Sequence, residues 1–250
     1  MTQQLRGKVA LITGGSSGLG LAAAKRFAAE GASVFITGRR QEELDKAVSQ
    51  ISGDVIAVQA DSSSPADLDR LYEIIGLKKG RLDIVFANAG ILEKGAIGEI
   101  TEDSVDRLFD VNVKGIIFTV QKALPLLADG GAILLTSSLV ASKGLPANSI
   151  YAATKASIRS LARGWMVDLK DRKIRVNTIS PGAIETPGLK GGAADSVAAQ
   201  GMLDHFATLI PAGRVGEPDD IAKVAVFLAS ENASYINGAD IPVDGGWTQV

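Results

Sequence analysis

The fold of this chain is decided by the stretch Val9-Ala10-Leu11-Ile12-Thr13-Gly14-Gly15-Ser16-Ser17-Gly18-Leu19-Gly20. A short apolar run leads into a loop of glycine and serine, and a helical pattern begins at residue 19. Glycine lets the chain turn sharply and lets the backbone approach a ligand without a Cβ. The start of the following helix would offer free N–H groups and a positive dipole end, which suit a pyrophosphate. The spacing G-x-x-x-G-x-G differs from the common G-x-G-x-x-G, and a turn without a ligand is the alternative. The position of the loop directly after the first predicted strand favours a dinucleotide site.

The rest of the chain alternates between short apolar runs and longer helical patterns. The runs predict strands at 9–13, 33–37, 55–59, 84–87, 132–137, 174–179 and 240–243. The helical patterns lie at 19–29, 41–51, 66–78, 105–127, 149–169 and 219–229. This alternation predicts a parallel sheet with helices on both faces. A (β/α)₈ barrel also alternates, but about seven strands and the glycine loop in the first turn favour an open, doubly wound α/β sheet of the Rossmann type.

The organisation indicates one domain. No linker or shift in composition divides the chain, so residues 1–250 are expected to form a single dinucleotide-binding and catalytic domain. The segment 183–214 interrupts the alternation, is rich in glycine and alanine, and contains one predicted helix at 196–206. We interpret this segment as a substrate lid.

The composition excludes several classes of function. Hydrophobic residues make up 46% of the chain and charged residues 22%, which is typical of a folded globular protein. The chain has no cysteine, so it has no disulfide, thiolate zinc site or cysteine nucleophile. His205 is the only histidine, and no metal site is expected. The net charge of -2 and the scattered basic residues do not suggest nucleic-acid binding, and the apolar runs are too short to cross a membrane. We expect a cytoplasmic protein.

The end of the second predicted strand indicates which nicotinamide cofactor the chain prefers. An acid about 20 residues past the glycine loop commonly binds the ribose 2′-hydroxyl. Here the stretch reads Thr37-Gly38-Arg39-Arg40, so the acid is absent. A guanidinium can hold a 2′-phosphate with two hydrogen bonds. We therefore expect NADP(H) to be preferred, with Arg39 as the main cause and Arg40 as a helper. Nothing at Gly38 repels NAD(H), and the alternative is that both arginines are the solvated start of a helix.

A tyrosine and a lysine share one face of the predicted helix 149–169. Tyr151 and Lys155 are four residues apart, the spacing of neighbours on a helix. The reference pKa of a phenol is about 10, and a neighbouring ammonium would lower it. The pair could therefore act as an acid and base near neutral pH. An ordinary partly buried tyrosine beside a solvated lysine is the alternative.

Taken together, these residues resemble the classical short-chain dehydrogenase/reductase family over essentially the whole chain. The loop at 13–20 matches the T-G-x-x-x-G-x-G motif, and Asn88-Ala89-Gly90 matches the N-A-G segment. Ser138 lies thirteen residues before Tyr151, and Tyr151 with Lys155 matches Y-x-x-x-K. Further matches are Asn112 in a helix and the P-G-x-x-x-T segment of Pro181, Gly182 and Thr186.

The resemblance implies four catalytic residues. Tyr151 would be the proton donor in reduction and the base in oxidation. Ser138 would hydrogen-bond the substrate oxygen, although Ser137 is a neighbouring candidate. Lys155 would lower the pKa of the tyrosine and bind the nicotinamide ribose. Asn112 would support a path of water to Lys155.

The resemblance also implies a cofactor site and an assembly. Asp61 would meet the adenine, Asn88 and Gly90 would line the cofactor channel, and Ile184 and Thr186 would anchor the carboxamide. The full set of implied cofactor-binding residues is Thr13, Gly14, Ser16, Ser17, Gly18, Leu19, Gly20, Arg39, Arg40, Asp61, Ser62, Asn88, Ala89, Gly90, Tyr151, Lys155, Pro181, Gly182, Ile184 and Thr186. The resemblance also implies a homotetramer, built on the helices 105–127 and 149–169 and on the last strand. The tail around Trp247 would pack at subunit contacts or fill the core.

The expected function is that of an oxidoreductase that moves a hydride between NADP(H) and a carbonyl compound or secondary alcohol. Three alternatives stay open: a non-catalytic sensor of nicotinamide dinucleotides, an NAD(H)-dependent alcohol dehydrogenase, and a lyase or epimerase that recycles its cofactor. An enoyl reductase is less favoured, because that branch of the family spaces its tyrosine and lysine differently.

Overall fold

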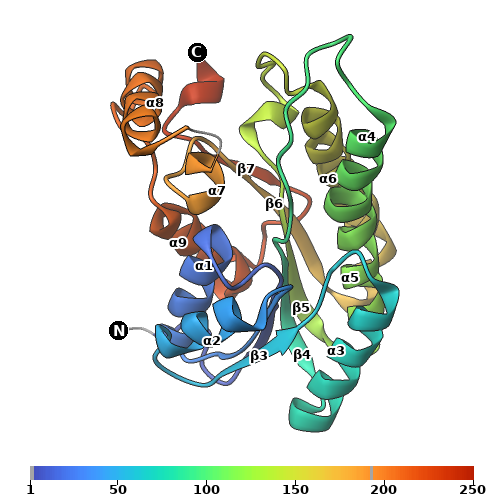
Figure 1. The fold of residues 1–250 in the computed structure, drawn as a ribbon. Coiled ribbons are helices and arrows are strands. Elements are labelled where there is room, and N and C mark those ends of the chain that lie inside the picture. The colour runs from blue at the N-terminus through green and yellow to red at the C-terminus, as the bar shows by residue number, and fades with distance from the viewer. Residues whose placement is uncertain (1–2, 192–193) are drawn as a thin grey trace.

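The computed structural model describes residues 3–191 and 194–250, and its centre is a single sheet of seven parallel strands (Figure 1). The strands are β1 (Val9–Ile12), β2 (Ser33–Gly38), β3 (Val55–Gln59), β4 (Leu82–Ala87), β5 (Leu127–Thr136), β6 (Arg175–Pro181) and β7 (Asp240–Val243). Their order is β3-β2-β1-β4-β5-β6-β7, and each neighbouring pair is parallel. The sheet is open, so the predicted doubly wound fold is confirmed and the barrel is excluded. The strand order reverses between β1 and β4, which is where such sheets bind ligands at their carboxyl ends.

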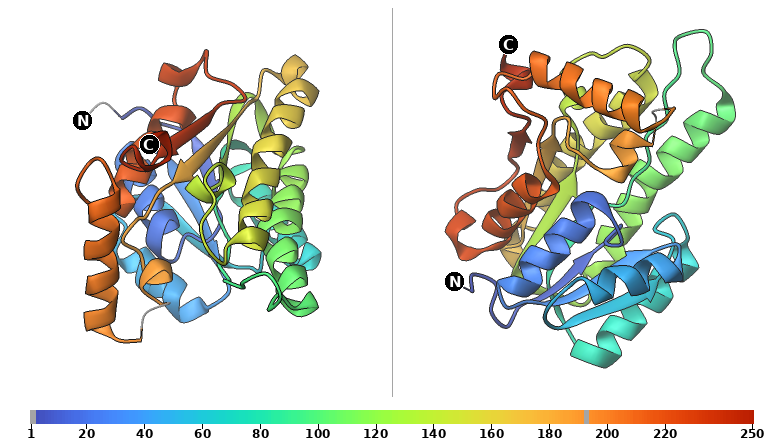
Figure 2. Two further views of the ribbon diagram at one scale, coloured as in Figure 1. Left: turned by 90° about the horizontal axis from the view of Figure 1, so that it is seen from above. Right: turned by 60° about the vertical axis from the view of Figure 1, so that its left-hand side comes forward.

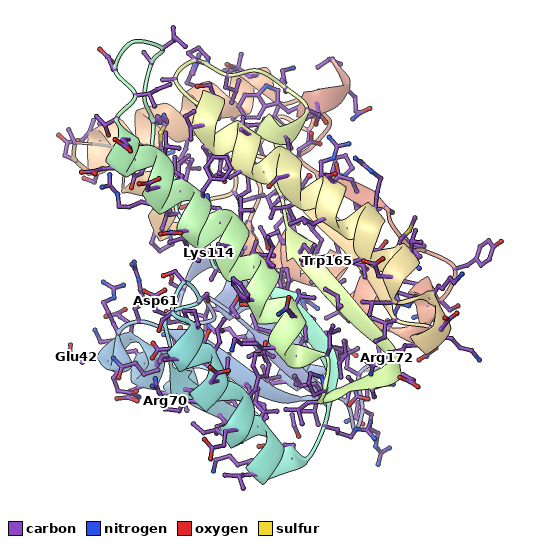
Figure 3. The ribbon with its side chains drawn as sticks, turned by 90° about the vertical axis from the view of Figure 1, so that its right-hand side faces the viewer. Glu42, Asp61, Arg70, Lys114, Trp165 and Arg172 are labelled. Carbon is purple, nitrogen blue, oxygen red and sulfur yellow. The ribbon has the colours of Figure 1, made fainter. Side chains whose placement is uncertain are left out.

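Helices cover both faces of the sheet, as the nearly continuous apolar strands require. On one face lie α1 (Gly18–Ala29), α2 (Gln41–Ser49) and α9 (Pro218–Ala229), whose apolar side chains form one core cluster with the sheet (Figure 1). On the other face α3 (Pro65–Lys79), α5 (Gly115–Ala123) and α6 (Ser149–Asp168) form the second. Figure 3 shows this second face, with Trp165 on α6 and Arg70 on α3. Most of the predicted elements occur in place, with ends shifted by a few residues.

The prediction of one continuous α-helix at 105–127 is wrong, because the helical segment begins and ends earlier and contains a π-helical turn. The chain instead forms α4 (Glu102–Phe109), one π-helical turn η1 (Asp110–Lys114), and α5, which ends at Ala123. Pro125 cannot continue a helix because it has no N–H and its ring clashes with the preceding turn. β5 therefore begins at Leu127, five residues before the predicted start, with a shift of register against β4.

The predicted lid contains two helices, of which the sequence indicated one. α8 (Ser196–Leu209) matches the predicted helix and is longer, whereas α7 (Pro187–Lys190) was not predicted. Thr186 caps α7 through its side chain and Pro187 occupies its first turn, a pairing that signals a helix start. Residues 192–193 of the lid lie outside the described residues. α8 and the C-terminal turn η5 (Trp247–Gln249) lie at the same end of the molecule (Figure 2).

Candidate active site

The loop after β1 requires glycine where the backbone has a positive φ angle and where a Cβ would collide with neighbouring atoms. Gly14 and Gly18 have φ angles of +67° and +51°, in the left-handed region that side chains disfavour. A Cβ at Gly20 would overlap the carbonyl oxygen of Gly14 and approach the side-chain nitrogen of Asn88. The loop is therefore tight because of its glycines, and this tightness brings the backbone of α1 close to the end of β1.

The first turn of α1 has the properties of an anion site. Ser17 occupies the N-cap position, but its side chain makes no capping hydrogen bond, and no acid lies in the first turn. The N–H groups at the start of a helix have no partner within the helix and attract negative charge. The loop and the helix start therefore fit the pyrophosphate of a dinucleotide, with Ser16, Leu19 and Gly20 around it.

The floor of the site ties three strands together at their carboxyl ends. The Thr13 hydroxyl accepts hydrogen bonds from the backbone N–H groups of Asn88 and Ala89, both at 3.0 Å. The Asn88 side chain donates to the carbonyl oxygen of Thr13 at 3.1 Å and accepts from the Thr136 hydroxyl at 3.1 Å. Thr13 and Asn88 thus fix β1, β4 and β5 relative to one another. Thr136 was not among the residues that the sequence indicated, because nothing in its spacing marks it.

The adenosine end of the site carries exposed cations. Arg39 and Arg40 follow β2 and are both exposed. The carbonyl oxygen of Arg39 accepts from the Gln59 side chain at 2.9 Å, while its guanidinium has no hydrogen bond or ion pair among the described residues. A Cβ at Gly38 would lie 3.0 Å from the Ser16 hydroxyl, so the loop packs closely against the end of β2.

Asp61 follows β3 and lies beside the start of α3 (Figure 3). One of its carboxylate oxygens accepts from the N–H and the hydroxyl of Ser63 at 2.9 and 2.7 Å. Ser62 is buried, and a Cβ at Gly115 would lie 3.1 Å from its carbonyl oxygen. The start of α5 therefore supports the loop on which the adenine is expected to lie.

The candidate catalytic pair, Tyr151 and Lys155, lies in the first two turns of α6. The Nζ atom of Lys155 is 5.8 Å from the centre of the Tyr151 ring and donates to the carbonyl oxygen of Thr136 at 2.9 Å. Lys155 is buried, and burial lowers its pKa from 10.5 to about 8. The alternative of a solvated lysine beside a tyrosine is therefore wrong.

The expected effect of Lys155 on Tyr151 is not seen. Burial raises the pKa of the Tyr151 phenol, and a hydrogen bond with the Ser138 side chain acts in the opposite direction. The free-energy cost of removing a phenolate from water is larger here than the attraction of an ammonium 5.8 Å from the centre of the ring. The prediction that the lysine lowers this pKa is thus corrected: burial is the larger effect.

The two candidate serines differ in what they contact. The Ser137 hydroxyl donates to the carbonyl oxygen of Lys155 at 2.9 Å, so it faces the interior of the fold. Ser138, two residues after β5, instead lies near Tyr151, where its side chain acts to lower the pKa of the phenol. This geometry supports Ser138 as the residue that would meet the substrate.

Asn112 lies in the π-helical turn and is fully buried. Its amide oxygen accepts from the N–H of Ile91 at 2.8 Å, and its amide nitrogen donates to the carbonyl oxygen of Ile91 at 2.9 Å and to Thr154 at 3.2 Å. A Cβ at Gly90 would lie 3.1 Å from the Asn112 oxygen and 3.3 Å from the Lys155 nitrogen. The wide turn therefore places Asn112, Gly90 and Lys155 together. Thr154 and Ile91 belong to this arrangement but left no sequence signal.

The wall opposite the glycine loop comes from the segment after β6. A Cβ at Gly182 would lie 2.6 Å from Asp244, so the chain passes closely by the end of β7 here, just after Pro181. Ile184 is buried and pairs with Gly216. Thr186 lies across the site from Gly18, whose added Cβ would be 3.4 Å from its methyl group. The fold thus brings these residues to the side of the loop where the nicotinamide is expected.

Two further observations bear on partners of the chain. Among residues 3–191 and 194–250, no helix has the length and apolar character needed to cross a membrane. Within the same ranges no three side chains of His, Cys, Asp or Glu cluster as metal ligands. His205 is exposed on α8, with its ring centre 6.3 Å from that of Phe206.

Comparison with known proteins identifies the family. A family model described as enoyl-(acyl carrier protein) reductase matches residues 14–248. The oxidoreductase asL5 of Sarocladium schorii is 47% identical over 250 residues, covering 99% of this chain and 98% of the relative. The NADP-dependent (R)-specific alcohol dehydrogenase of Lentilactobacillus kefiri is 37% identical over 255 residues, covering 99% of each chain. A solved short-chain dehydrogenase/reductase from Serratia marcescens superposes with a TM-score of 0.90 at 33% identity, covering 98% of this chain and 99% of that one. The chain belongs to the short-chain dehydrogenase/reductase family and is an oxidoreductase.

Proposed function

We propose that this oxidoreductase acts between NADP(H) and a carbonyl compound or the corresponding secondary alcohol. The observation that carries the proposal is the joint placement of Ser138, Tyr151 and Lys155 at the carboxyl ends of the strands, beside a loop that fits a dinucleotide. When bound, the nicotinamide donates or accepts the hydride. The protein supplies orientation, a proton and electrostatic stabilisation.

In the reductive direction Tyr151 donates its phenolic proton to the carbonyl oxygen, while Ser138 donates a hydrogen bond to the same oxygen. Both donors stabilise the negative charge that develops there. An ammonium on Lys155 would lessen the cost of the phenolate that remains on Tyr151 without outweighing its burial, and the phenolate regains a proton from solvent. In the oxidative direction the phenolate accepts the proton of the alcohol, so one residue serves as acid and as base.

The proposal gives the supporting residues separate tasks. Asn112 holds the loop after β4 beside Lys155 through the backbone of Ile91, and a water relay to Lys155 would pass at this point. Lys155 would also bind the nicotinamide ribose, with Gly90 leaving room for it. Asn88 and Thr13 keep the channel open, and Ile184 and Thr186 would hold the carboxamide.

We infer NADP(H) rather than NAD(H) from the end of β2. The Arg39 guanidinium is exposed and has no partner among the described residues, which leaves it available for a 2′-phosphate. Gly38 provides no carboxylate to repel that phosphate. The NADP-dependent alcohol dehydrogenase to which the chain is similar supports the same preference.

The function is tested with a panel of ketones, aldehydes and secondary alcohols, each assayed with NADPH, NADH or the oxidised forms. We expect NADPH to be consumed in proportion to alcohol formed. Product without consumption would indicate a lyase or epimerase that recycles its cofactor. Cofactor binding without turnover of any compound would indicate a sensor.

Enoyl reduction is the second candidate, because the matching family model carries that description. The four-residue spacing of Tyr151 and Lys155 favours carbonyl reduction instead. Crotonyl thioester in the same assay distinguishes the two activities.

We also propose a homotetramer. α4 and α6 leave Phe109 and Val167 39% and 57% exposed, and Ala153 and Ala156 on α6 would let a second helix approach closely. Closed symmetry is usual for soluble homo-oligomers. Light scattering at micromolar concentration tests this, and a monomeric mass would contradict it.

A further inference from the structure

A third apolar cluster, separate from the two that cover the sheet, lies at the catalytic end of the molecule. We call it the catalytic wall. Its buried members include Leu139 and Val140, which directly follow Ser138, together with Ile210 and Trp247. The side chain of Tyr151 packs against this cluster. The wall therefore borders the tyrosine on the side where a substrate body would lie next to its carbonyl group.

Trp247 joins the catalytic wall to the lid. Its side chain is only 5% exposed, and its ring centre is 5.4 Å from that of Phe206 on α8, with the rings tilted by 53°. Tilted aromatic pairs at this distance attract each other beyond the burial of their area. The C-terminal turn and α8 are neighbours in Figure 2, and Trp247 is the aromatic contact between them. The N–H of Ala212, just after α8, also donates to the carbonyl oxygen of Gly245 at 3.0 Å.

The C-terminal turn is itself fixed from two sides. Lys143, five residues after Ser138, donates to the main-chain oxygens of Trp247 and Val250 at 2.8 and 2.6 Å. Asp244 is buried and accepts from the N–H groups of Gly246 and Thr248 and from the Thr248 hydroxyl, at 2.9, 2.8 and 2.6 Å. The loop that carries Ser138 is thereby connected to the lid through Trp247.

The chemistry of the catalytic wall indicates what it can bind. The side chains that make up this cluster are apolar apart from the Tyr151 hydroxyl and the indole N–H of Trp247. The charged groups at its border are engaged: Lys143 with main-chain oxygens, Asp244 with three donors. A carboxylate or phosphate placed against this wall would lose water without gaining a partner, which costs several kcal/mol for an isolated ion.

We propose that Trp247 is a specificity-determining residue. By holding α8 against the catalytic wall, it makes the enzyme select carbonyl substrates whose body is uncharged and apolar, and reject those with an anionic group beside the carbonyl. The inference rests on the proposed function, in which Tyr151 transfers a proton to that carbonyl.

The test compares ketones that differ by one charge. Acetophenone and benzoylformate share a phenyl ketone, but a methyl group in the first is a carboxylate in the second; 2-octanone and 2-oxooctanoate form an aliphatic pair. We expect kcat/KM to favour the uncharged member of each pair at least about tenfold. Trp247→Ala should raise KM for acetophenone about tenfold or more while kcat changes less than about threefold, because the residue acts on the substrate body.

Three variants separate specificity from folding. Trp247→Phe keeps an aromatic ring for Phe206 and should restore KM to within about threefold of the parent. Lys143→Met leaves the wall intact and releases the turn, so it should raise the same KM severalfold with an unchanged melting temperature. Trp165→Phe, on α6 but packed in the second core cluster and not in the catalytic wall, should leave the ratio between the paired ketones unchanged.

A binding experiment separates this inference from the proposed function. In the Trp165→Phe background Trp247 is the single tryptophan, and its fluorescence reports binding of acetophenone or benzoylformate in the presence of NADP+. Tighter binding of acetophenone without turnover would preserve the specificity inference and refute the proposed function. Equal or tighter binding of benzoylformate, or an unchanged KM in both Trp247→Ala and Lys143→Met, would overturn the inference.

Discussion

Lys155 and Arg39 are both cations at the carboxyl ends of strands, but the fold treats them in opposite ways. Lys155 is buried beneath the loop after β4, with its ammonium on the carbonyl oxygen of Thr136. Arg39 is exposed, and its guanidinium has no partner within the ranges that the structure describes. Burial shifts the pKa of Lys155 to about 8, much closer to neutral pH than its ordinary value of 10.5. An exposed cation instead acts by attraction that water and salt screen. From this comparison we expect changes near the buried Lys155 to alter the turnover number by large factors. Changes at the exposed Arg39 should alter the preference between cofactors by smaller factors.

The largest effect is expected at the buried end. Tyr151→Phe keeps the ring in the catalytic wall but removes the transferable proton. Turnover should fall by about 10²–10⁴-fold, with little change in cofactor affinity. Steady-state kinetics and a cofactor titration measure both quantities. Tyr235→Phe is the matched control, since Tyr235 is fully exposed and should tolerate the change. Turnover near that of the parent in a folded Tyr151→Phe protein would remove Tyr151 from the mechanism.

The exposed end should give a smaller effect on selectivity. The parent is expected to bind NADPH about ten- to a few hundred-fold more tightly than NADH, and Arg39→Ala should abolish most of this ratio. Titration of both reduced cofactors against the two proteins measures it, and higher salt should reduce the ratio in the parent. Arg6→Ala, another exposed arginine, serves as the control. A parent that prefers NADH, or a ratio that Arg39→Ala leaves unchanged, would refute the assignment.

Burial of the Lys155 ammonium should also lower the free energy of unfolding of the protein. Its pKa is about 8 in the folded protein and 10.5 ordinarily, so the unfolded chain binds more protons between these values and stability rises with pH there. Below pH 8 the folded state holds a buried ammonium at a disadvantage. Lys155→Met removes this cost along with one hydrogen bond, and at pH 7 the inactive variant should be more stable by about 1–2 kcal/mol.

Urea unfolding at pH 7 and at pH 10.5 measures this difference. The advantage of Lys155→Met should mostly disappear at the higher pH, because the parent's lysine is then neutral in the folded state and about half neutral in the unfolded state. Lys78→Met, on the exposed side of α3, should show no such dependence on pH. A variant that is less stable than the parent at pH 7 would mean that the hydrogen bond to Thr136 outweighs the desolvation of the ammonium.

The smallest effect is expected at an exposed ion pair. Arg26 on α1 binds Asp219 on α9 through two contacts of 2.6 Å, and this lowers the pKa of Asp219 to about 2. Since the folded pKa lies below the unfolded one, the pair stabilises above about pH 4 and loses this effect as the pH falls to 2. Both side chains are more than one third exposed, so Arg26→Met should cost less than about 1 kcal/mol at pH 7 and almost nothing at pH 2.

Urea unfolding of the parent and Arg26→Met at these two pH values, in low and high salt, measures the pair. Lys25→Met, whose ammonium contacts only the amide of Gln50 among the described residues, is the control. A loss of several kcal/mol in the free energy of unfolding at pH 7 would show that exposure does not limit the strength of charge pairs in this fold. The contrast drawn between the buried Lys155 and the exposed Arg39 would then be wrong.

The sequence by itself determined the sheet, the glycine loop and the spacing of the candidate catalytic residues, because each depends on a local pattern. Apolar runs of strand length predict parallel strands, and Gly14, Gly18 and Gly20 mark a turn that other residues could not form. The spacing of Tyr151 and Lys155 places them on one helix face whatever surrounds that helix. The choice of Ser138 followed from its distance to Tyr151 and agrees with the contacts of the two serines.

What the sequence missed depends on contacts between distant segments. The π-helical turn that holds Asn112 against Ile91 and Thr154 has no signature in a helical pattern, although Pro125 could have ended the predicted helix earlier. The supporting role of Thr136 appears only when β4, β5 and α6 come together.

The direction of the Tyr151 pKa shift was likewise decided by tertiary structure. Spacing alone indicated that the neighbouring ammonium would dominate, but packing against the catalytic wall removes water from the phenol and raises its pKa. The position of Trp247 between Phe206 and the Ser138 loop was also decided by packing. Desolvation and side-chain contact depend on which segments meet in space, whereas local patterns record only what each segment forms by itself.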